Sequence, residues 1–470
     1  MSNKYSVLKK NTIIFTVGNV GSSLISFLLI PLFTNFLTTS EYGKIDFITM
    51  LITLFIPILT LNLVEGLVRF GLDNNYNKKN VISSIIFTLL SIFIIVGMIT
   101  LLLVMIGVFN ISIIYYLGIF IIVSIYQILQ QYTRISDKLK VFAFSDILYT
   151  IIFSTLNIIF IANLKIGIRG YFIAYVLANI ITSIFIIVTT RVDKDIRVKF
   201  INREYINEFT KYSIPLIPNS LSWWIVNASD RFIIKIFNGY SDLGVYSVAN
   251  KVPQILNTFY SLFFKAWQIS SIKELGKSDT EKFYSQIFLY LSKVMFSIGV
   301  CILLGINLIF TIMIGPEFKE AVLFVPILVF AIIFYTMASF IGTIYTANKK
   351  SKEILKSTIF SAIINIVINL IFMYKFGTIV ACISTLISYF FLFVYRVYDS
   401  KRFMKLTINY KEIIFSSAIY SMMIVNISIF KISLITFIIN CILTIIYVLF
   451  NTEYVKKIIF YFCLRGKNAK

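Results

Sequence analysis

The sequence predicts an all-α protein that crosses a membrane many times. Hydrophobic residues make up 59% of the 470 residues and charged residues only 14%. Apolar runs of about 20 residues, the length that spans a bilayer as a helix, recur from one end of the chain to the other. No stretch longer than about 30 residues lacks such a run, so the chain does not supply the polar surface that a soluble domain needs.

The spans are delimited by charged and Gly/Asn-rich segments, which divide the chain into fourteen candidate helices. The first follows a short basic lead without a small-residue cleavage site, so we expect a retained helix and not a signal peptide. The candidate helices start near residues 11, 45, 81, 112, 141, 168, 212, 244, 285, 320, 354, 377, 411 and 432.

The distribution of the basic residues along the chain indicates the membrane topology. The formal net charge is +22, which could indicate nucleic-acid binding, but the distribution favours topology. With a cytoplasmic amino terminus, the inner segments hold 32 of the 43 Lys and Arg residues and the outer segments hold six. The positive-inside rule therefore predicts an even number of spans and two cytoplasmic termini. The basic residues left within the predicted spans are Arg231, Lys235, Lys251, Lys265 and Lys293.

Cysteine and histidine give no sign of a metal site or a cofactor. The cysteines are scattered without metal-ligand spacing, and histidine is absent, so any proton coupling must use carboxylates. No GxxxxGK[ST] nucleotide-binding motif is present, which leaves the energy source open. We expect structural roles for all four cysteines, Cys301, Cys382, Cys441 and Cys463.

An internal repeat divides the spans into two halves. "SEYG" at residues 40–43 resembles "SDLG" at 241–244, and "LNIIF" at 156–160 resembles "INLIF" at 368–372, in the same order. An even number of helices in each half gives both halves the same orientation, and substrate sites in such transporters lie between them. The predicted parts are an amino-terminal lobe (1–190), a basic cytoplasmic linker (191–211), a carboxy-terminal lobe (212–400), and two further helices with a basic tail (401–470).

The eighth span carries the strongest polar signal. Its polar residues share one helical stripe roughly 120° wide, and each charge facing lipid would cost about 2.5–3.5 kcal/mol at the bilayer centre. We favour a water-filled cavity, while a hydrogen-bonding seam between helices or a helix lying at the interface stay open. The first span has a milder stripe that includes Asn19. The stripe of the eighth span contains Ser247, Asn250, Lys251, Gln254, Asn257, Thr258, Ser261, Lys265 and Gln268.

The seventh span contains "NASDRFIIKIF", residues 227–237. Trp223, Asn227 and Arg231 are spaced four apart and share one face. Asp230 lies beside them and is expected to orient Arg231 or partly neutralise it. The alternative for Arg231 is a salt bridge that holds adjacent helices together, and Lys235 is expected to extend to the outer interface.

The second span carries Glu65 and Arg69, spaced for an ion pair within one helix. The repeat offset also aligns Glu65 with Lys265, which suggests a contact across the pseudo-axis as the alternative. We expect Asp146, near the start of the fifth span, to pair with lysines of the neighbouring inner loop.

The net charge of the candidate cavity predicts the charge of the ligand that it binds. The cavity is expected to be net positive, because Asp230 is outnumbered by Arg231, Lys251 and Lys265. We therefore expect it to bind a mobile anion in preference to a cation. Arginine and lysine bind phosphate through charge-assisted hydrogen bonds.

The segment from Lys211 to Ile255 resembles the central signature of the bacterial polysaccharide repeat-unit flippases, the Wzx-type branch of the multidrug/oligosaccharidyl-lipid/polysaccharide exporter superfamily. The resemblance rests on "PLIP" at the start of the seventh span, the Asp230–Arg231 pair and "GVYSVANK" at residues 244–251. "TNFLTTSEYG" near the amino terminus and "GIRGYFIAY" at residues 167–175 are also similar.

The resemblance implies two six-helix lobes in a V shape with two further helices, and alternating access to the two sides of the membrane. It implies that an undecaprenyl-diphosphate-linked oligosaccharide passes to the outer leaflet of the cytoplasmic membrane for O-antigen or capsule synthesis. Expected partners are the lipid-linked substrate, membrane lipid and glycan polymerase or assembly proteins, with no nucleic acid. We assign the diphosphate to Arg231, Lys251 and Lys265 and the polar cavity lining to Asn19, Asn227, Asn250, Gln254, Asn257 and Ser261, with Asp230, Glu65 and Arg69 as coupling or ion-pair residues.

Three alternatives remain. An ion-coupled multidrug antiporter of the same superfamily is expected to have carboxylates in its lobes, whereas here the clearest carboxylate, Asp230, lies beside an arginine. A membrane enzyme such as a glycan polymerase is expected to have a sizeable outer loop, and the predicted outer loops are short, so we predict no enzyme. A flippase for another lipid-linked glycan, such as the peptidoglycan precursor, has the same sequence features.

Overall fold

The computed structural model describes residues 21–73, 75–274, 279–348 and 350–452, and these residues form an all-helical, multi-pass membrane protein. Ten helices of the described chain are long and apolar enough to cross a membrane, and two shorter apolar helices, Gly21–Phe36 and Leu434–Phe450, accompany them. Every predicted start from residue 45 onward lies within two turns of the first residue of a helix. The predicted start near residue 11 lies outside the described residues.

The chain divides into two compact units, Met1–Lys235 and Ile236–Lys470. The division falls near the end of α10 (Ile217–Phe237), so nearly all of the predicted seventh span packs with the first unit. The lobe boundaries at residues 190 and 212 stay a prediction.

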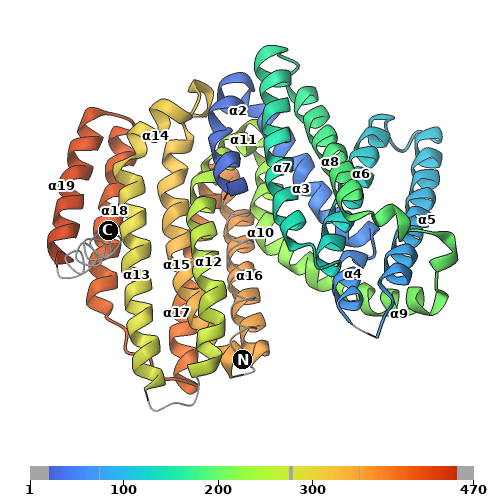
Figure 1. Ribbon diagram of the computed structural model, residues 1–470. Helices are drawn as coiled ribbons and strands as arrows, with labels where there is room; N and C mark the ends of the chain where they lie inside the picture. The colour runs from blue at the N-terminus through green and yellow to red at the C-terminus, as the bar shows by residue number, and fades with distance from the viewer. Residues whose placement is uncertain (1–20, 74, 275–278, 349, 453–470) are drawn as a thin grey trace, which may run out of the picture. The chain divides into compact units, whose positions relative to one another are not determined.

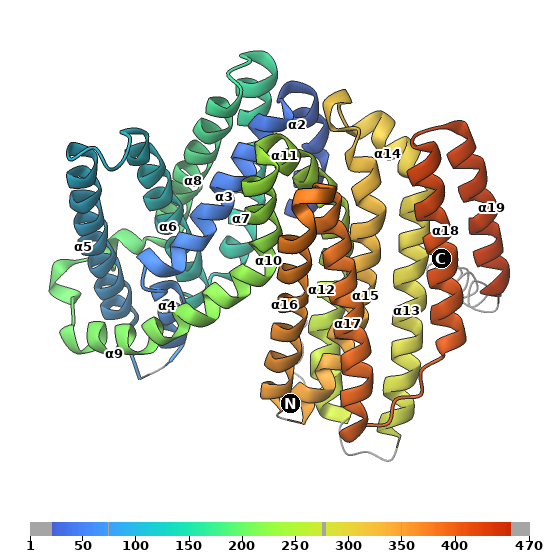
Figure 2. The ribbon, with the colours of Figure 1, turned by 180° about the vertical axis from the view of Figure 1, so that it is seen from behind.

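The first unit is built around three neighbouring helices, α6, α7 and α8, which pack against one another. The helix α5 lies at one edge of this unit in both ribbon views (Figures 1 and 2). Together with α10, the helices of this unit are α2 (Ile30–Phe36), α3 (Thr39–Leu59), α4 (Leu63–Gly71), α5 (Lys78–Met105), α6 (Ser112–Ile135), α7 (Leu139–Asn157), α8 (Ile168–Thr190) and α9 (Arg203–Ser213).

The predicted second span is two helices and not one. Thr60 ends α3, and Leu61 and Asn62 take φ angles of +49° and +54° before α4 begins. Two consecutive residues in the left-handed region cannot continue a right-handed helix, so the chain changes direction here. Pro57, inside the last turn of α3, removes one helical N–H donor just before the break.

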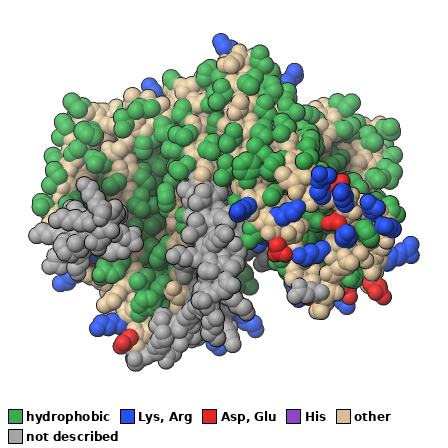
Figure 3. Space-filling model, viewed as in Figure 1, with side chains coloured by type: hydrophobic (Ala, Val, Ile, Leu, Met, Phe, Trp, Pro, Cys, Tyr) green, Lys and Arg blue, Asp and Glu red, His purple; other side chains and the backbone are tan. Residues whose placement is uncertain are grey.

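The predicted linker is a docked part of the first unit. The Ser83 hydroxyl donates to the carbonyl oxygen of Asp195 at 2.7 Å, and the Tyr132 hydroxyl donates to the Asp195 carboxylate at 2.6 Å. Lys79 pairs with the same carboxylate at 3.3 Å, and the N–H of Asn202 donates to the Ser84 hydroxyl at 3.0 Å. Basic side chains gather over this end of the unit (Figure 3). The linker therefore covers the ends of α5 and α6.

The second unit packs around α15, most of whose side chains are buried. The predicted eighth span is again two helices, separated at Asn250. The helices are α11 (Gly239–Ala249), α12 (Lys251–Glu274), α13 (Thr280–Leu304), α14 (Ile306–Met313), α15 (Ala321–Ala347), α16 (Ser351–Phe376), α17 (Ile379–Asp399), α18 (Tyr410–Phe430) and α19 (Leu434–Phe450).

The last two helices, α18 and α19, lie beside α13 at the edge of the second unit (Figures 1 and 2). An ion pair of 3.1 Å joins Lys293 of α13 to Glu412 of α18. Near the other end of α18, the Asn426 amide donates to the Asn440 side chain at 2.9 Å, and the Asn440 amide donates to the carbonyl oxygen of Leu303 at 3.0 Å. These polar contacts fix the extra pair of helices to the unit.

The two units repeat one local arrangement, as the sequence repeat predicts. Gly167 and Gly377, which precede α8 and α17, have φ angles of +61° and +71°, a conformation that favours glycine. The acid of each repeated motif lies at its own glycine loop. The Glu41 Oε1 atom lies 2.8 Å from the position of a Cβ on Gly167, and the Thr378 hydroxyl donates to Asp242 at 2.7 Å.

Candidate functional site

The candidate site begins at a seam between α3 and α10. The Arg231 Nε atom lies 3.3 Å from the Asp46 Oδ2 atom. Two turns earlier on α10, the indole N–H of Trp224 donates to the carbonyl oxygen of Met50 at 3.2 Å. Residue numbers rise along α3 as they fall along α10, so the two helices run antiparallel along the seam.

Aromatic rings extend the seam beyond the ion pair. Phe47 and Phe232 stack with ring centroids 6.0 Å apart, and the Lys235 Nζ atom lies 5.5 Å from the Phe47 centroid. A cation at this distance from a ring face is attracted by the ring electrons. Lys235, expected to extend to the outer interface, therefore packs over Phe47.

Arg231 has an ion-pair partner that the sequence analysis did not name. That partner is the Asp46 carboxylate. Asp230, which was expected to orient or neutralise Arg231, is half-buried on α10, and its role stays a prediction. The salt bridge between adjacent helices, which the sequence left as the alternative, is present. A single Asp within the apolar run that starts near residue 45 was the available signal for Asp46. The Trp223 and Asn227 side chains lie outside the described part.

The polar stripe on α12 lies opposite the face that packs into the second unit. Gln254 is exposed, and Lys251, Asn257 and Ser261 are half-buried. Asn250, in the gap before α12, is also half-buried. The part of the stripe on α12 is therefore on the surface of this unit, whereas Ser247, the first residue of the predicted stripe, is buried in α11. The opposite face of α12 is buried and consists of Val252, Leu256, Tyr260 and Trp267.

Two other predicted site residues, Asn19 and Lys265, have no described side chain. Their roles, and the suggested contact of Lys265 with Glu65, stay predictions.

The predicted ion pair within α4 has a different acid. Arg69 pairs with Asp73 at 3.1 Å, one turn further along the chain, while Glu65 is exposed and pairs with no cation among the described residues. Asp146 also differs from expectation, because its carboxylate accepts a hydrogen bond from the Gln130 amide of α6 and not from a loop lysine. One lysine of that loop, Lys138, donates to the carbonyl oxygen of Thr189 at the end of α8.

Arg396, one of the 32 basic residues assigned to the inner segments from the sequence, is buried in α17 with 5% of its surface exposed. Its guanidinium donates to the Ser357 hydroxyl at 3.1 Å, the Thr358 hydroxyl at 3.1 Å and the carbonyl oxygen of Ala338 at 2.9 Å. Among the described residues no carboxylate pairs with it. Arg396 thereby joins α15, α16 and α17 through neutral acceptors. Gly342 makes room for it, because a Cβ there would lie 2.7 Å from Nη1.

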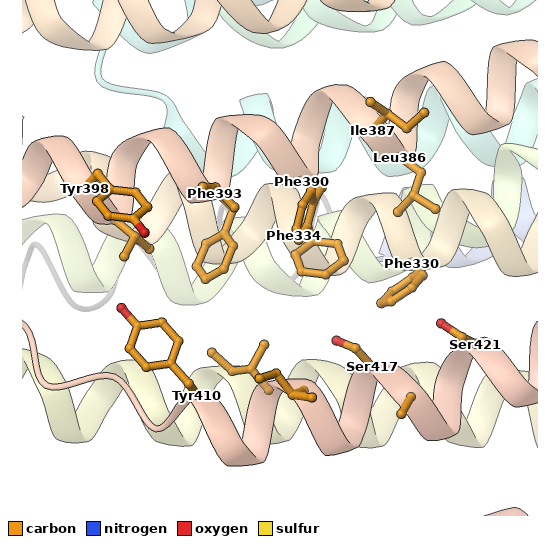
Figure 4. Close-up of a pocket in the computed structure, with 15 residues that line it drawn as sticks. Phe330, Phe334, Leu386, Ile387, Phe390, Phe393, Tyr398, Tyr410, Ser417 and Ser421 are labelled. Atoms are coloured by element: carbon orange, nitrogen blue, oxygen red, sulfur yellow. The ribbon is translucent and has the colours of Figure 1, made fainter.

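An apolar groove of about 700 Å³ runs between α17 and α18, with α15 as its floor. Figure 4 shows the aromatic rings of Phe330, Phe334 and Phe390 along the groove and the hydroxyl groups of Tyr398 and Tyr410 at one end. That end is adjacent in the chain to a basic segment, residues 401–411, with four Lys and Arg residues. The remaining lining residues are Leu386, Ile387, Phe393, Val394, Val397, Ile413, Ile414, Ser417, Ala418 and Ser421.

Comparison with known families gives two matches. The model of a family described as polysaccharide biosynthesis protein matches residues 8–268, which is more than half of the chain. The model of a second family, MatE, matches residues 215–371. No curated protein matches the chain.

Solved structures share the fold. A structure described as lipid II flippase MurJ in an inward closed conformation superimposes with a TM-score of 0.67 at 15% identity, covering 95% of this chain and 100% of that one. An inward-facing multidrug resistance MATE family transporter of the MOP superfamily superimposes with a TM-score of 0.58 at 14% identity, covering 83% of this chain and 95% of that one. At these identities the likeness is one of fold.

Proposed function

Since the chain belongs to the polysaccharide biosynthesis protein family and has the fold of a lipid flippase, we propose that it translocates an undecaprenyl-diphosphate-linked oligosaccharide repeat unit. The transport crosses the cytoplasmic membrane by alternating access and serves the synthesis of a surface polysaccharide, O-antigen or capsule. Both termini are cytoplasmic in this proposal, and glycan polymerase or assembly proteins act on the product.

The observation that carries the proposal is the presence of accessible cations on α10 and α12, the helices of the predicted seventh and eighth spans. Arg231 keeps 22% of its side chain exposed on α10, and Lys251 opens the polar stripe of α12. A charged group on a helix that crosses the bilayer is costly unless it meets water, protein or a charged ligand. A diphosphate satisfies Arg and Lys through charge-assisted hydrogen bonds, so Arg231, Lys251 and Lys265 bind the diphosphate in this proposal.

In this proposal the sugars of the substrate bind polar side chains of the same predicted spans. Amide and hydroxyl side chains donate and accept hydrogen bonds in the way that sugar hydroxyls require. The apolar groove between α17 and α18 offers part of the polyprenyl chain a surface of aromatic and aliphatic side chains. The proposed polar lining consists of Asn19, Asn227, Asn250, Gln254, Asn257 and Ser261.

The test is surface glycan in a deletion strain, complemented with wild type, Arg231→Ala, Lys251→Ala or Lys319→Ala. The first two variants should lose most surface glycan at normal membrane levels of the protein and accumulate the lipid-linked precursor inside. Lys319, an exposed lysine before α15, is the matched control and should complement fully. Full complementation by Arg231→Ala and Lys251→Ala together would refute the cationic site.

The second candidate function is that of an ion-coupled multidrug antiporter. The observation in its favour is the match of the MatE model to residues 215–371, which include α10 and α12. Resistance of the complemented strain to cationic drugs separates the two functions, because an antiporter raises resistance and leaves surface glycan unchanged. A flippase for another lipid-linked glycan is recognised by which precursor accumulates in the deletion strain.

A further inference from the structure

We propose that Asp46 is a competing counter-ion, which holds Arg231 between transport events and is replaced there by the anionic headgroup of the substrate. The inference rests on the proposed function, because it takes Arg231 as a ligand of the headgroup. It adds Asp46, on a different helix, as the residue that sets how tightly the headgroup is held and how readily it leaves.

The geometry of the ion pair places carboxylate and headgroup in competition. Asp46 approaches the Nε atom of Arg231 at 3.3 Å, and that N–H belongs to the planar fork with which a guanidinium binds phosphate oxygens. An oxygen of a phosphate that uses the same edge of the guanidinium must share or displace the Asp46 oxygen. Both side chains are accessible enough for the exchange, at 22% exposure for Arg231 and 13% for Asp46.

The charges favour exchange over simultaneous binding. A diphosphate is a polyanion, so a headgroup on Arg231 would lie beside the Asp46 carboxylate and be repelled by it. The repulsion ends when Asp46 moves away from Arg231. In the reverse step Asp46 returns to the guanidinium and restores the ion pair when the headgroup leaves.

The counter-ion exchange would also affect the other contacts between α3 and α10. The Trp224 hydrogen bond to Met50 and the stacking of Phe47 on Phe232 join the same two helices. The ion pair is the charged contact among these, and an anion competes for it directly. Binding of the headgroup therefore weakens the seam beside Asp46, which links occupancy of the site to the packing of α3 against α10.

The first experiment measures binding of farnesyl diphosphate, an isoprenyl diphosphate without a glycan, to the full-length purified protein in nanodiscs. Asp46→Asn removes the competing charge and keeps the shape, so binding should tighten about tenfold, an effect within the usual range of coupling between sites. Asp46→Glu keeps the competing charge and should bind as wild type. Glu412→Gln removes a carboxylate from another membrane ion pair and should also bind as wild type, which excludes an effect of net charge.

The outcomes separate this inference from the function on which it rests. Unchanged or weaker binding by Asp46→Asn, with weaker binding by Arg231→Ala, would overturn the exchange and leave Arg231 as a headgroup ligand. Wild-type binding by Arg231→Ala would overturn both assignments.

A second measurement uses only the wild-type chain and does not depend on the folding of a variant. Hydrogen–deuterium exchange of peptides from the first half of α3 is compared with and without farnesyl diphosphate. The counter-ion exchange predicts faster deuterium uptake around Asp46 when the probe is bound, because the seam has lost its ion pair. Slower or unchanged uptake there would overturn the inference.

Discussion

Gly342 on α15 offers a quantitative test of how the second unit is held together. A Cβ at this position would lie 2.7 Å from the Nη1 atom of Arg396, closer than non-bonded atoms approach. In Gly342→Ala the guanidinium must move, and the bond from Nη1 to the carbonyl oxygen of Ala338, now 2.9 Å, is lost. The variant therefore removes one hydrogen bond of the buried Arg396 side chain and keeps its charge.

The magnitude follows from two opposed effects. Loss of a hydrogen bond from a charged donor costs about 1.5–3 kcal/mol, while Gly→Ala in a helix interior gains up to about 1 kcal/mol. The net destabilisation is about 1–2 kcal/mol, which lowers the melting temperature of a unit of this size by about 2–8 °C. Gly97→Ala on α5 is the matched control, since its Cβ meets no atom within 4 Å, and should melt at or above the wild-type temperature.

A cysteine on the same helix as Arg396 supplies the assay. Cys382 is fully buried in α17, so a thiol-reactive dye labels it when the unit unfolds, in a background where the other three cysteines are serine. If the clash with Arg396 is the cause, adding Arg396→Met to Gly342→Ala should cost less than the two single changes together. A wild-type melting temperature for Gly342→Ala, or fully additive losses, would refute the reasoning.

Three further predictions concern other contacts. Glu412→Gln should destabilise the protein by about 2–3 kcal/mol because it leaves Lys293 without its ion-pair partner, and Lys293→Met in the same chain should recover most of that loss in a double-mutant cycle. Gly377→Ala should cost about 1–2 kcal/mol in thermal unfolding because φ is +71°, although the nearest atom to its Cβ is 3.5 Å away. The Asn75 backbone N–H holds the pKa of Asp73 below its usual range, so this carboxylate favours the fold at neutral pH and the contribution is lost only as the pH falls through the lowered pKa. The melting temperature of Asp73→Asn should therefore depend less on pH in the acidic range than that of wild type.

The sequence predicts the membrane fold well because the bilayer imposes a local rule. A span needs about 20 apolar residues, so each helix is visible in its own segment without knowledge of its neighbours. The stripe on α12 was visible for the same reason, since helical periodicity alone places Gln254, Asn257 and Ser261 on one face. The breaks at Asn62 and Asn250 were not predicted, because each lies inside a segment that was assigned to a single span.

The sequence does not show which residues come into contact when they are far apart in the chain. Trp224 and Met50 meet although 174 residues separate them, and nothing in either segment specifies the other. The same holds for Asp46 and Arg231, so the adjacent Asp230 was the natural but incomplete choice. Arg396 was misplaced for a related reason, because it lies close to the inner loop in sequence while neutral acceptors on α15 and α16 draw it into the core.

The two functions that the sequence offered for Arg231, ligand of an anion and partner in a salt bridge, are compatible in a transporter. Without Asp46, release of the headgroup would leave Arg231 without this ion pair, and a charge on a helix within the bilayer is costly when it loses a partner. A cation that only held α3 to α10 would have no need of its 22% exposure. A carboxylate at 3.3 Å lowers the affinity for the anion and also lowers the energy of the empty site. The Asp46 carboxylate therefore favours both release of the headgroup and stability of the empty site. When its charge is removed, we expect the main effect to be that substrate stays bound to Arg231, ahead of any loss of stability of the fold.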